Sequence, residues 1–157
     1  MENTFYGLGI APKLLEILDQ LKYTIPTPIQ QRAIPPAIEG KDLIGIAQTG
    51  TGKTLAFGVP MVQRLASVKG QGLILLPTRE LALQVDETFQ KIGRAIGLRT
   101  AVLIGGASMT RQMQMLHRRV HVIIATPGRL LDHLGQGSIK LKEVKVLVLD
   151  EADRMLD

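Results

Sequence analysis

Several residue types are missing from this chain of 157 residues, or nearly so. It contains no cysteine and no tryptophan, and only three phenylalanines and two tyrosines. The lack of cysteine excludes a disulfide framework and a cysteine-ligated zinc site. The only histidines are His117, His121 and His133, and they do not have the spacing of metal ligands. We therefore expect them at the surface or in an interface rather than around a metal.

Long apolar runs are missing as well. No apolar segment approaches the roughly 20 residues that a membrane-spanning helix needs, and the N-terminus lacks the positive-then-apolar pattern of a signal peptide. We therefore expect no membrane partner and a cytoplasmic location. The chain has no internal repeat, low-complexity segment or linker, so its length predicts one domain with a real core.

The charge of the chain is unbalanced toward basic residues. Nineteen Lys and Arg against fourteen Asp and Glu give a formal net charge of +5. A positive balance favours a polyanionic partner but does not identify one. Arg111, Arg118, Arg119 and Arg129 are close in sequence. Such a cluster is usually a solvated surface, and RNA contact by Arg118 and Arg119 is the alternative.

Short apolar runs alternate with helix-like segments, which is the pattern of a parallel α/β sheet. Strands are expected near residues 43–46, 73–76, 100–104, 121–125 and 145–149. Helices are expected near residues 53–67, 80–96, 108–117 and 128–134. Two earlier helical stretches are expected, one that begins at Pro12 and one over residues 30–38 that Pro35 and Pro36 interrupt.

A glycine-rich segment follows the first expected strand. It consists of Ala47, Gln48, Thr49, Gly50, Thr51, Gly52, Lys53 and Thr54. A turn of this kind between strand and helix directs backbone N–H groups and the positive end of the helix dipole at one point, which suits a polyphosphate. Lys53 would reach the outer phosphates and Thr54 would offer its hydroxyl to Mg²⁺. Because Ala47 stands where the general pattern has Gly, a plain glycine-rich turn beside an exposed lysine is the alternative.

Two adjacent carboxylates follow the last expected strand. The run 144–149 has the composition of a fully buried strand and leads into Asp150-Glu151-Ala152-Asp153. Adjacent carboxylates there are costly without a nearby cation, and Mg²⁺ on a nucleotide would supply that charge. Asp150 would then hold the metal, and Glu151 would polarise the attacking water as general base. The alternative is an acidic helix start that complements the helix dipole.

With both motifs in this order, the chain resembles the DEAD-box family of ATP-dependent RNA helicases over essentially its whole length. The namesake tetrapeptide of the family is Asp150 to Asp153, and the family's own form of the phosphate loop begins with Ala, so Ala47 fits. The resemblance implies a RecA-like P-loop NTPase domain, with a parallel sheet flanked by helices. It also implies ATP and Mg²⁺ as cofactors, with Lys53, Asp150 and Glu151 as catalytic residues.

Tyr23 and the run Pro26-Thr27-Pro28-Ile29-Gln30 resemble the adenine-reading Q motif of this family, with Phe5 as the upstream aromatic. The Gln30 amide carries a donor and an acceptor, so it can pair with N7 and the N6 amine of adenine, while Tyr23 would stack on the base. Lys22 departs from the pattern, because many members have Gly there. Without the resemblance, Tyr23 would be interpreted as a core aromatic and Gln30 as a surface residue.

Three further motifs, each after an expected strand, resemble the family's RNA contacts. They are Pro77-Thr78-Arg79, Gly105-Gly106 and Thr126-Pro127-Gly128-Arg129. Open α/β sheets place ligands at the carboxyl ends of strands, and small residues and helix starts there suit phosphate oxygens and ribose hydroxyls. None of the five aromatic residues falls in these motifs, which favours backbone contacts that are largely independent of RNA sequence. Helix capping and solvated charge are the alternative.

The resemblance also implies what the chain does as a whole. Residues 1–157, with the Q-motif region in 5–30, are expected to form an incomplete N-terminal RecA-like domain that lacks its last strands. The family continues with a Ser-Ala-Thr motif and a second RecA-like domain with arginine fingers. The full-length parent is therefore expected to couple ATP hydrolysis to local RNA unwinding. This segment is expected to bind adenine nucleotide and to contribute half of the RNA site, without unwinding alone.

Three possibilities remain open from the sequence. Strands left unpaired by the missing part of the sheet are expected to shift, swap or associate between chains. A DNA-acting helicase or translocase of the same superfamily is one functional alternative. A non-catalytic RNA- or protein-binding module is the other.

Overall fold

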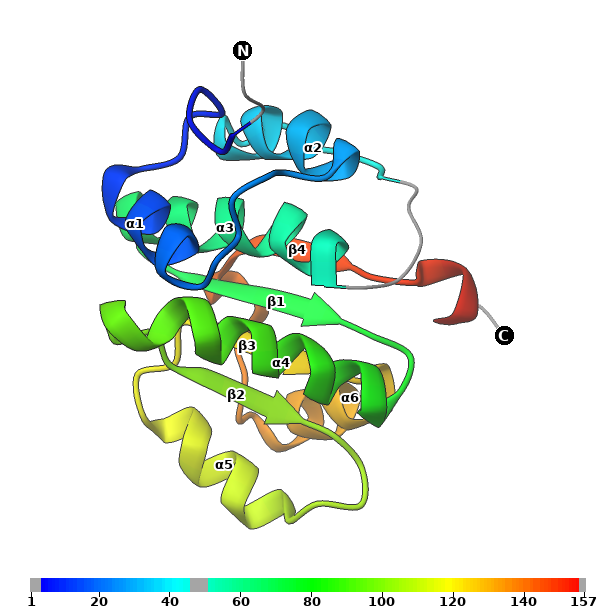
Figure 1. Cartoon of the computed structure of the whole chain (residues 1–157). Coiled ribbons are helices and arrows are strands. Elements are labelled where there is room, and N and C mark those ends of the chain that lie inside the picture. The colour runs from blue at the N-terminus through cyan, green and yellow to red at the C-terminus, as the bar shows by residue number, and fades with distance from the viewer. Residues whose placement is uncertain (1–3, 46–50, 156–157) are drawn as a thin grey trace. The chain divides into compact units, whose positions relative to one another are not determined.

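The structure is a computed structural model that describes residues 4–45 and 51–155 (Figure 1). The chain divides into two compact units, Met1–Val68 and Lys69–Asp157. Among the described helices, none combines the length and the apolar character that crossing a membrane requires.

The first unit begins with α1 (Pro12–Gln20), which ends in a left-handed turn. The Tyr23 N–H donates to the Leu18 carbonyl and the Lys22 N–H donates to the Asp19 carbonyl, both at 2.9 Å. These are the two bonds of a Schellman motif. Lys22 occupies its left-handed position with a φ of 67°. Since glycine adopts this conformation at the least cost, the turn explains why Gly is common at this position of the resembled motif.

The second helix, α2 (Pro28–Ile38), passes through Pro35 and Pro36 without ending, so the predicted interruption is wrong. Each proline removes one backbone donor, but the helix continues to Ile38, and the Glu39 N–H donates to the Pro35 carbonyl at 3.3 Å. The helix also packs against α3 (Thr51–Ser67) within the same unit (Figure 1). This packing compensates for the lost hydrogen bonds, since most helical stability in proteins comes from tertiary contacts.

The strand expected over residues 43–46 is not formed where the structure describes it. Leu43, Ile44 and Gly45 have no strand conformation, and the Ile44 side chain is 97% exposed. Ile46 lies outside the described residues. A strand is held by ladder hydrogen bonds to a neighbour, and none of the described ladders includes this segment.

The second unit contains a four-stranded parallel sheet in the order β2–β3–β1–β4. The strands are β1 (Gln71–Leu75), β2 (Thr100–Leu103), β3 (Val122–Ala125) and β4 (Val144–Leu149). The helices are α4 (Arg79–Gly93), α5 (Met109–His117) and α6 (Pro127–Gln136), with 3₁₀ turns at Arg94–Ile96, Leu141–Glu143 and Ala152–Met155. Helices flank the sheet (Figure 1). The α/β fold and these four strands are confirmed.

The core of this unit lies between the sheet and its helices. All four residues of β3 are buried, as in a strand that is covered on both faces. One cluster of buried apolar side chains joins three strands to α6 and the loops around them. It contains Leu73, Ala101, Leu103, Val120, Ile123, Ala125, Leu130 and Ile139. This packing fixes the point at which each strand ends, and hence the loops that follow.

β4 is not the fully buried strand that its composition predicted. Its residues alternate between partly buried and exposed, and Leu147 and Leu149 are 56% and 53% exposed. The exposed residues are two apart and therefore share one face of the strand. β4 is also the last strand in the sheet order and pairs, within the described residues, with β1 alone. Apolar composition alone does not distinguish a central strand from one at an edge.

Candidate nucleotide and nucleic-acid sites

Gln30 connects the start of α2 to the start of α3. Its Oε1 accepts from the Thr27 N–H at 2.8 Å, and its Nε2 donates to the Gly52 carbonyl at 3.0 Å. The Gln30 N–H completes a capping box by donating to Thr27 Oγ1 at 3.4 Å. Gln30 is 3% exposed, so the plain interpretation as a surface residue is wrong. Its amide keeps one N–H and one acceptor lone pair beyond these bonds.

The other residues expected at the nucleotide lie around this connection or outside the described chain. Ala47, Gln48, Thr49 and Gly50 lie outside the described residues, and only the backbone of Thr51 is described. Gly52, Lys53 and Thr54 form the first turn of α3, where a helix start favours phosphate. A Cβ at Gly52 would lie 3.3 Å from Thr27 Cγ2, so glycine permits the close approach of the two helix starts.

The aromatic residues of the expected Q motif differ in burial. Phe5 is 3% exposed and belongs to the core of the first unit. Tyr23 is half-buried, directly after the left-handed turn at Lys22. The structure therefore leaves part of the Tyr23 side chain accessible, whereas Phe5 acts as packing.

The two expected catalytic carboxylates follow β4 in the second unit. The Asp150 N–H donates to the Leu75 carbonyl at 3.0 Å, which fixes this residue to the end of β1, and Asp150 is 9% exposed. Glu151 adopts a left-handed conformation with a φ of 54°, and its Oε2 lies 3.2 Å from Arg154 Nη1. A non-glycine residue in that conformation costs on the order of 1 kcal/mol, which the surrounding turn has to offset.

The three expected RNA motifs gather at the carboxyl edge of the sheet (Figure 1). Backbone hydrogen bonds align the strand ends, with the Leu76 N–H on the Ala125 carbonyl at 3.0 Å and the Thr126 N–H on the Leu103 carbonyl at 3.1 Å. The loops that carry the three motifs therefore leave the sheet at neighbouring points along its carboxyl edge. Because the strands are parallel, each loop leads into the N-terminus of a helix, where the positive end of the dipole favours phosphate.

Thr78 and Thr126 both occupy the N-cap position of a helix, but only Thr78 makes a capping hydrogen bond. Thr78 Oγ1 accepts from the Leu81 N–H at 3.2 Å and so caps α4. Thr126 precedes Pro127, which opens α6, and its hydroxyl makes no capping bond. The capping alternative is thus correct for Thr78, whose hydroxyl can still donate, and does not account for Thr126.

Arg79 and Gly106 come from different loops and meet. A Cβ at Gly106 would collide with the Arg79 guanidinium, and Gly106 has a left-handed φ of 79°. The left-handed conformation favours glycine at this position, whereas the exposed Arg79 side chain could move away from an added Cβ. Arg79 itself is exposed, so its charge is available to a ligand beside the glycine pair.

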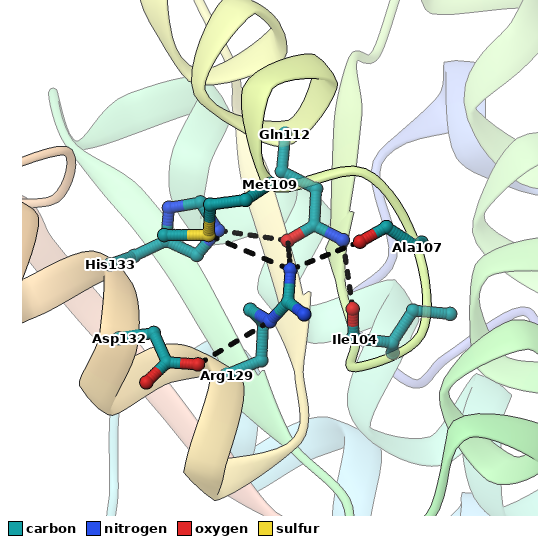
Figure 2. A network of polar contacts seen from close by, with 7 residues as sticks. All are labelled: Ile104, Ala107, Met109, Gln112, Arg129, Asp132 and His133. Carbon is teal, nitrogen blue, oxygen red and sulfur yellow. Dashed lines mark hydrogen bonds and ion pairs between the residues drawn. The ribbon is translucent and has the colours of Figure 1, made fainter.

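Arg129 is not the solvated charge of the alternative interpretation, because its side chain is only 15% exposed. Its Nη1 donates to the Ala107 carbonyl at 3.2 Å and to Gln112 Oε1 at 3.3 Å, and lies 3.5 Å from Met109 Sδ (Figure 2). Its buried Nε is 3.5 Å from Asp132 Oδ2, which is near enough for an ion pair but not aligned for a hydrogen bond. Arg129 thus holds the loop after β2.

His133 is completely buried, so its expected place at the surface is wrong. Its Nε2 lies 2.8 Å from Gln112 Oε1. Burial, and then the Arg129 charge, lower the pKa of His133 below its ordinary value of 6.5, against a smaller effect of Asp132. The sequence did carry a signal, since Leu130 and Leu134 lie three residues before and one residue after His133 on the inward side of α6.

The remaining histidines behave closer to expectation. His117 is exposed at the end of α5. His121 is partly buried, and its Nδ1 accepts from the Arg99 N–H at 2.9 Å. In the part of the chain that the structure describes, no three His, Asp or Glu residues gather as a metal-binding group.

Comparison with known proteins gives a consistent result. The family model described as DEAD/DEAH box helicase matches residues 27–157. The relatives include proteins named ATP-dependent rRNA helicase RRP3 from Debaryomyces hansenii (52% identical), Candida albicans (52%) and Pyricularia oryzae (51%). Each alignment covers 99% of this chain but 33%, 30% and 29% of the relative, so the chain spans about a third of their length.

Proposed function

Because the chain belongs to the DEAD/DEAH box helicase family, we propose that it forms the adenine-nucleotide site and half of the RNA site of an ATP-dependent RNA helicase. The bond between Gln30 and Gly52 carries the proposal, since it ties the expected base-reading residue to the phosphate-loop helix. The names of the relatives specify ribosomal RNA, which supports that class of substrate. They do not favour a cytoplasmic location over a nucleolar one, so the cytoplasmic location stays a prediction.

Adenine recognition would use the N–H and the acceptor lone pair of the Gln30 amide that its bonds to Thr27 and Gly52 do not occupy. Its second N–H would donate to N7 and its second lone pair would accept from the N6 amine, whereas guanine presents O6 in place of that amine. Tyr23 would stack on the base. The phosphates would lie against the backbone N–H groups and the Lys53 ammonium of the phosphate loop. That loop is Ala47, Gln48, Thr49, Gly50, Thr51, Gly52, Lys53 and Thr54.

The two residues proposed to hold magnesium carry oxygen donors. Thr54 offers a hydroxyl and Asp150 a carboxylate, which are the oxygen ligands that Mg²⁺ prefers, usually with several waters retained. When bound, the ion would neutralise charge on the outer phosphates. Glu151 would orient and deprotonate the attacking water as general base.

RNA would bind across the carboxyl edge of the sheet in the second unit. The proposed contacts are Pro77, Thr78, Arg79, Gly105, Gly106, Thr126, Pro127, Gly128 and Arg129. The starts of α4, α5 and α6 favour phosphate there, and none of the contact residues is aromatic. Such a surface suits the sugar–phosphate backbone and carries little base specificity.

A second RecA-like domain is the partner that the proposal requires for turnover. An arginine finger is worth roughly 10³ to 10⁵ in rate, so this chain alone should bind nucleotide with negligible hydrolysis. The experiment compares ATP hydrolysis by a protein extended through that domain, with single-stranded RNA or DNA of equal length. RNA should stimulate hydrolysis and DNA should not.

Glu151→Gln in that extended protein should lower the stimulated rate by about 10² to 10⁴, the usual contribution of a general base. Glu143→Gln, in an exposed turn before β4, is the matched control and should leave the rate unchanged. A wild-type rate in Glu151→Gln would refute its assignment. Equal stimulation by DNA would favour the DNA-acting alternative, and nucleotide-independent RNA binding without hydrolysis would favour a binding module.

A further inference from the structure

We propose that Gln112 and His133 are positioning residues that hold the loop over residues 105–108 in the shape that RNA binding needs. The proposal rests on the RNA-binding role given above to this loop. Neither residue belongs to the motifs that define the RNA site, and both are buried, at 3% and 0% exposure. Gln112 is on α5 and His133 is on α6, and the two side chains meet beside the loop (Figure 2).

Gln112 has one amide orientation because a backbone carbonyl fixes it. Its Nε2 donates to the Ile104 carbonyl at 2.9 Å, so its Oε1 must face α6. That oxygen accepts from His133 Nε2 at 2.8 Å and from Arg129 Nη1 at 3.3 Å, which occupies both of its lone pairs. The amide therefore joins the residue after β2 to α5 and α6 (Figure 2).

The same geometry fixes the protonation state of His133. Gln112 Oε1 can only accept, so the His133 hydrogen must be on Nε2. His133 Nδ1 is buried and has no hydrogen-bond partner among the described residues. A second proton at Nδ1 would find no acceptor and would lie close to the Arg129 charge, so His133 is a neutral donor.

The network holds the glycine pair from both sides. Gln112 binds the Ile104 carbonyl before the pair, and Arg129 Nη1 donates to the Ala107 carbonyl after it. Gly105 and Gly106 have no side chains of their own to restrain them, and glycine has the widest backbone freedom of any residue. Loss of either anchor would therefore release the Gly106 backbone and its contact with Arg79.

The test uses this chain, isotopically labelled, with a single-stranded uridine oligomer as the RNA probe. His133→Phe keeps a ring but removes the donor, and Gln112→Leu removes the junction. Each should weaken RNA binding about tenfold and speed hydrogen exchange at residues 105–108. His133→Gln keeps an amide donor near the position of Nε2 and should retain affinity. Binding of Mg-ADP should be unchanged in all three, because the proposed base-reading site is in the other unit.

The tautomer offers a test that needs no variant. Nitrogen-15 NMR of the wild-type chain at pH 7 should show that His133 is protonated at Nε2 and unprotonated at Nδ1. An Nδ1–H tautomer would overturn the proposed junction. If the wild type binds RNA, and His133→Phe has the same RNA affinity and the same hydrogen exchange at residues 105–108, the positioning role alone is overturned. A wild-type chain that bound no RNA would refute the RNA function and, with it, this role.

Discussion

At the scale of single residues, Lys22 carries a conformation that its side chain disfavours. Its φ of 67° places it in the left-handed region that ends α1. Lys22→Gly should raise the free energy of unfolding by about 0.5–1 kcal/mol, because glycine pays little for this backbone shape. Urea denaturation measures the change. Glu16→Gly, in the middle of α1, is the control and should lower stability by about 1 kcal/mol.

Gln30 permits a sharp substitution because its two amide atoms have different partners. Gln30→Glu keeps the acceptor for the Thr27 N–H but places a carboxylate oxygen against the Gly52 carbonyl. The same change removes the donor to adenine N7. We expect affinity for Mg-ADP to fall at least about tenfold, since a buried acceptor loses its partner. Gln31→Glu, one residue along α2, should bind as the wild type does; an unchanged Gln30→Glu would contradict the assignment.

His133 gives the stability of the chain a dependence on pH. Burial and Arg129 lower its pKa, so the folded chain takes up this proton less readily than the unfolded chain does. Stability is then complete above the unfolded pKa of 6.5 and falls as the pH drops below it, since only the unfolded state gains the proton. His133→Gln should have a shallower loss of stability below pH 6.5 in denaturant titrations. An identical slope in both proteins would contradict a buried neutral histidine.

At the scale of secondary structure, β4 is the element most prone to association between chains. It is the last strand in the described order, and Leu147 and Leu149 on it are more than half exposed. Apolar strands at sheet edges promote association between chains. Leu149→Lys should therefore reduce concentration-dependent self-association in sedimentation velocity. Leu131→Lys is the control, because Leu131 is 67% exposed but lies on α6. Equal effects of both substitutions would show that β4 has no special role.

The elements of the second unit could be predicted because their signals are local. The strands are four to six residues long and mostly apolar, and Thr78, Ser108 and Thr126 are the N-cap residues of the helices that follow three of them. The errors have a different origin. Pro35 and Pro36 stay in a helix because α2 packs against α3. Similarly, residues 43–45 form no strand because no described ladder includes them.

At the scale of the whole molecule, the motifs predicted which residues make up the candidate sites but not how they are held. Gln30 and Gly52 are 22 residues apart, and so are Arg129 and Ala107. No local pattern reports such contacts, because they depend on how separate elements pack. Gln112 was missed for this reason, since a glutamine in an amphipathic helix gives no local sign that it faces the interior.

The central claim is that this chain holds an adenine nucleotide through Gln30 and the start of α3. Calorimetric titration of the chain with Mg-ADP and, separately, with Mg-GDP tests it most directly. We predict binding of Mg-ADP and affinity at least about a hundredfold lower for Mg-GDP, because guanine would leave the buried Gln30 amide mispaired. Equal binding of the two nucleotides, or binding of neither, would contradict the claim.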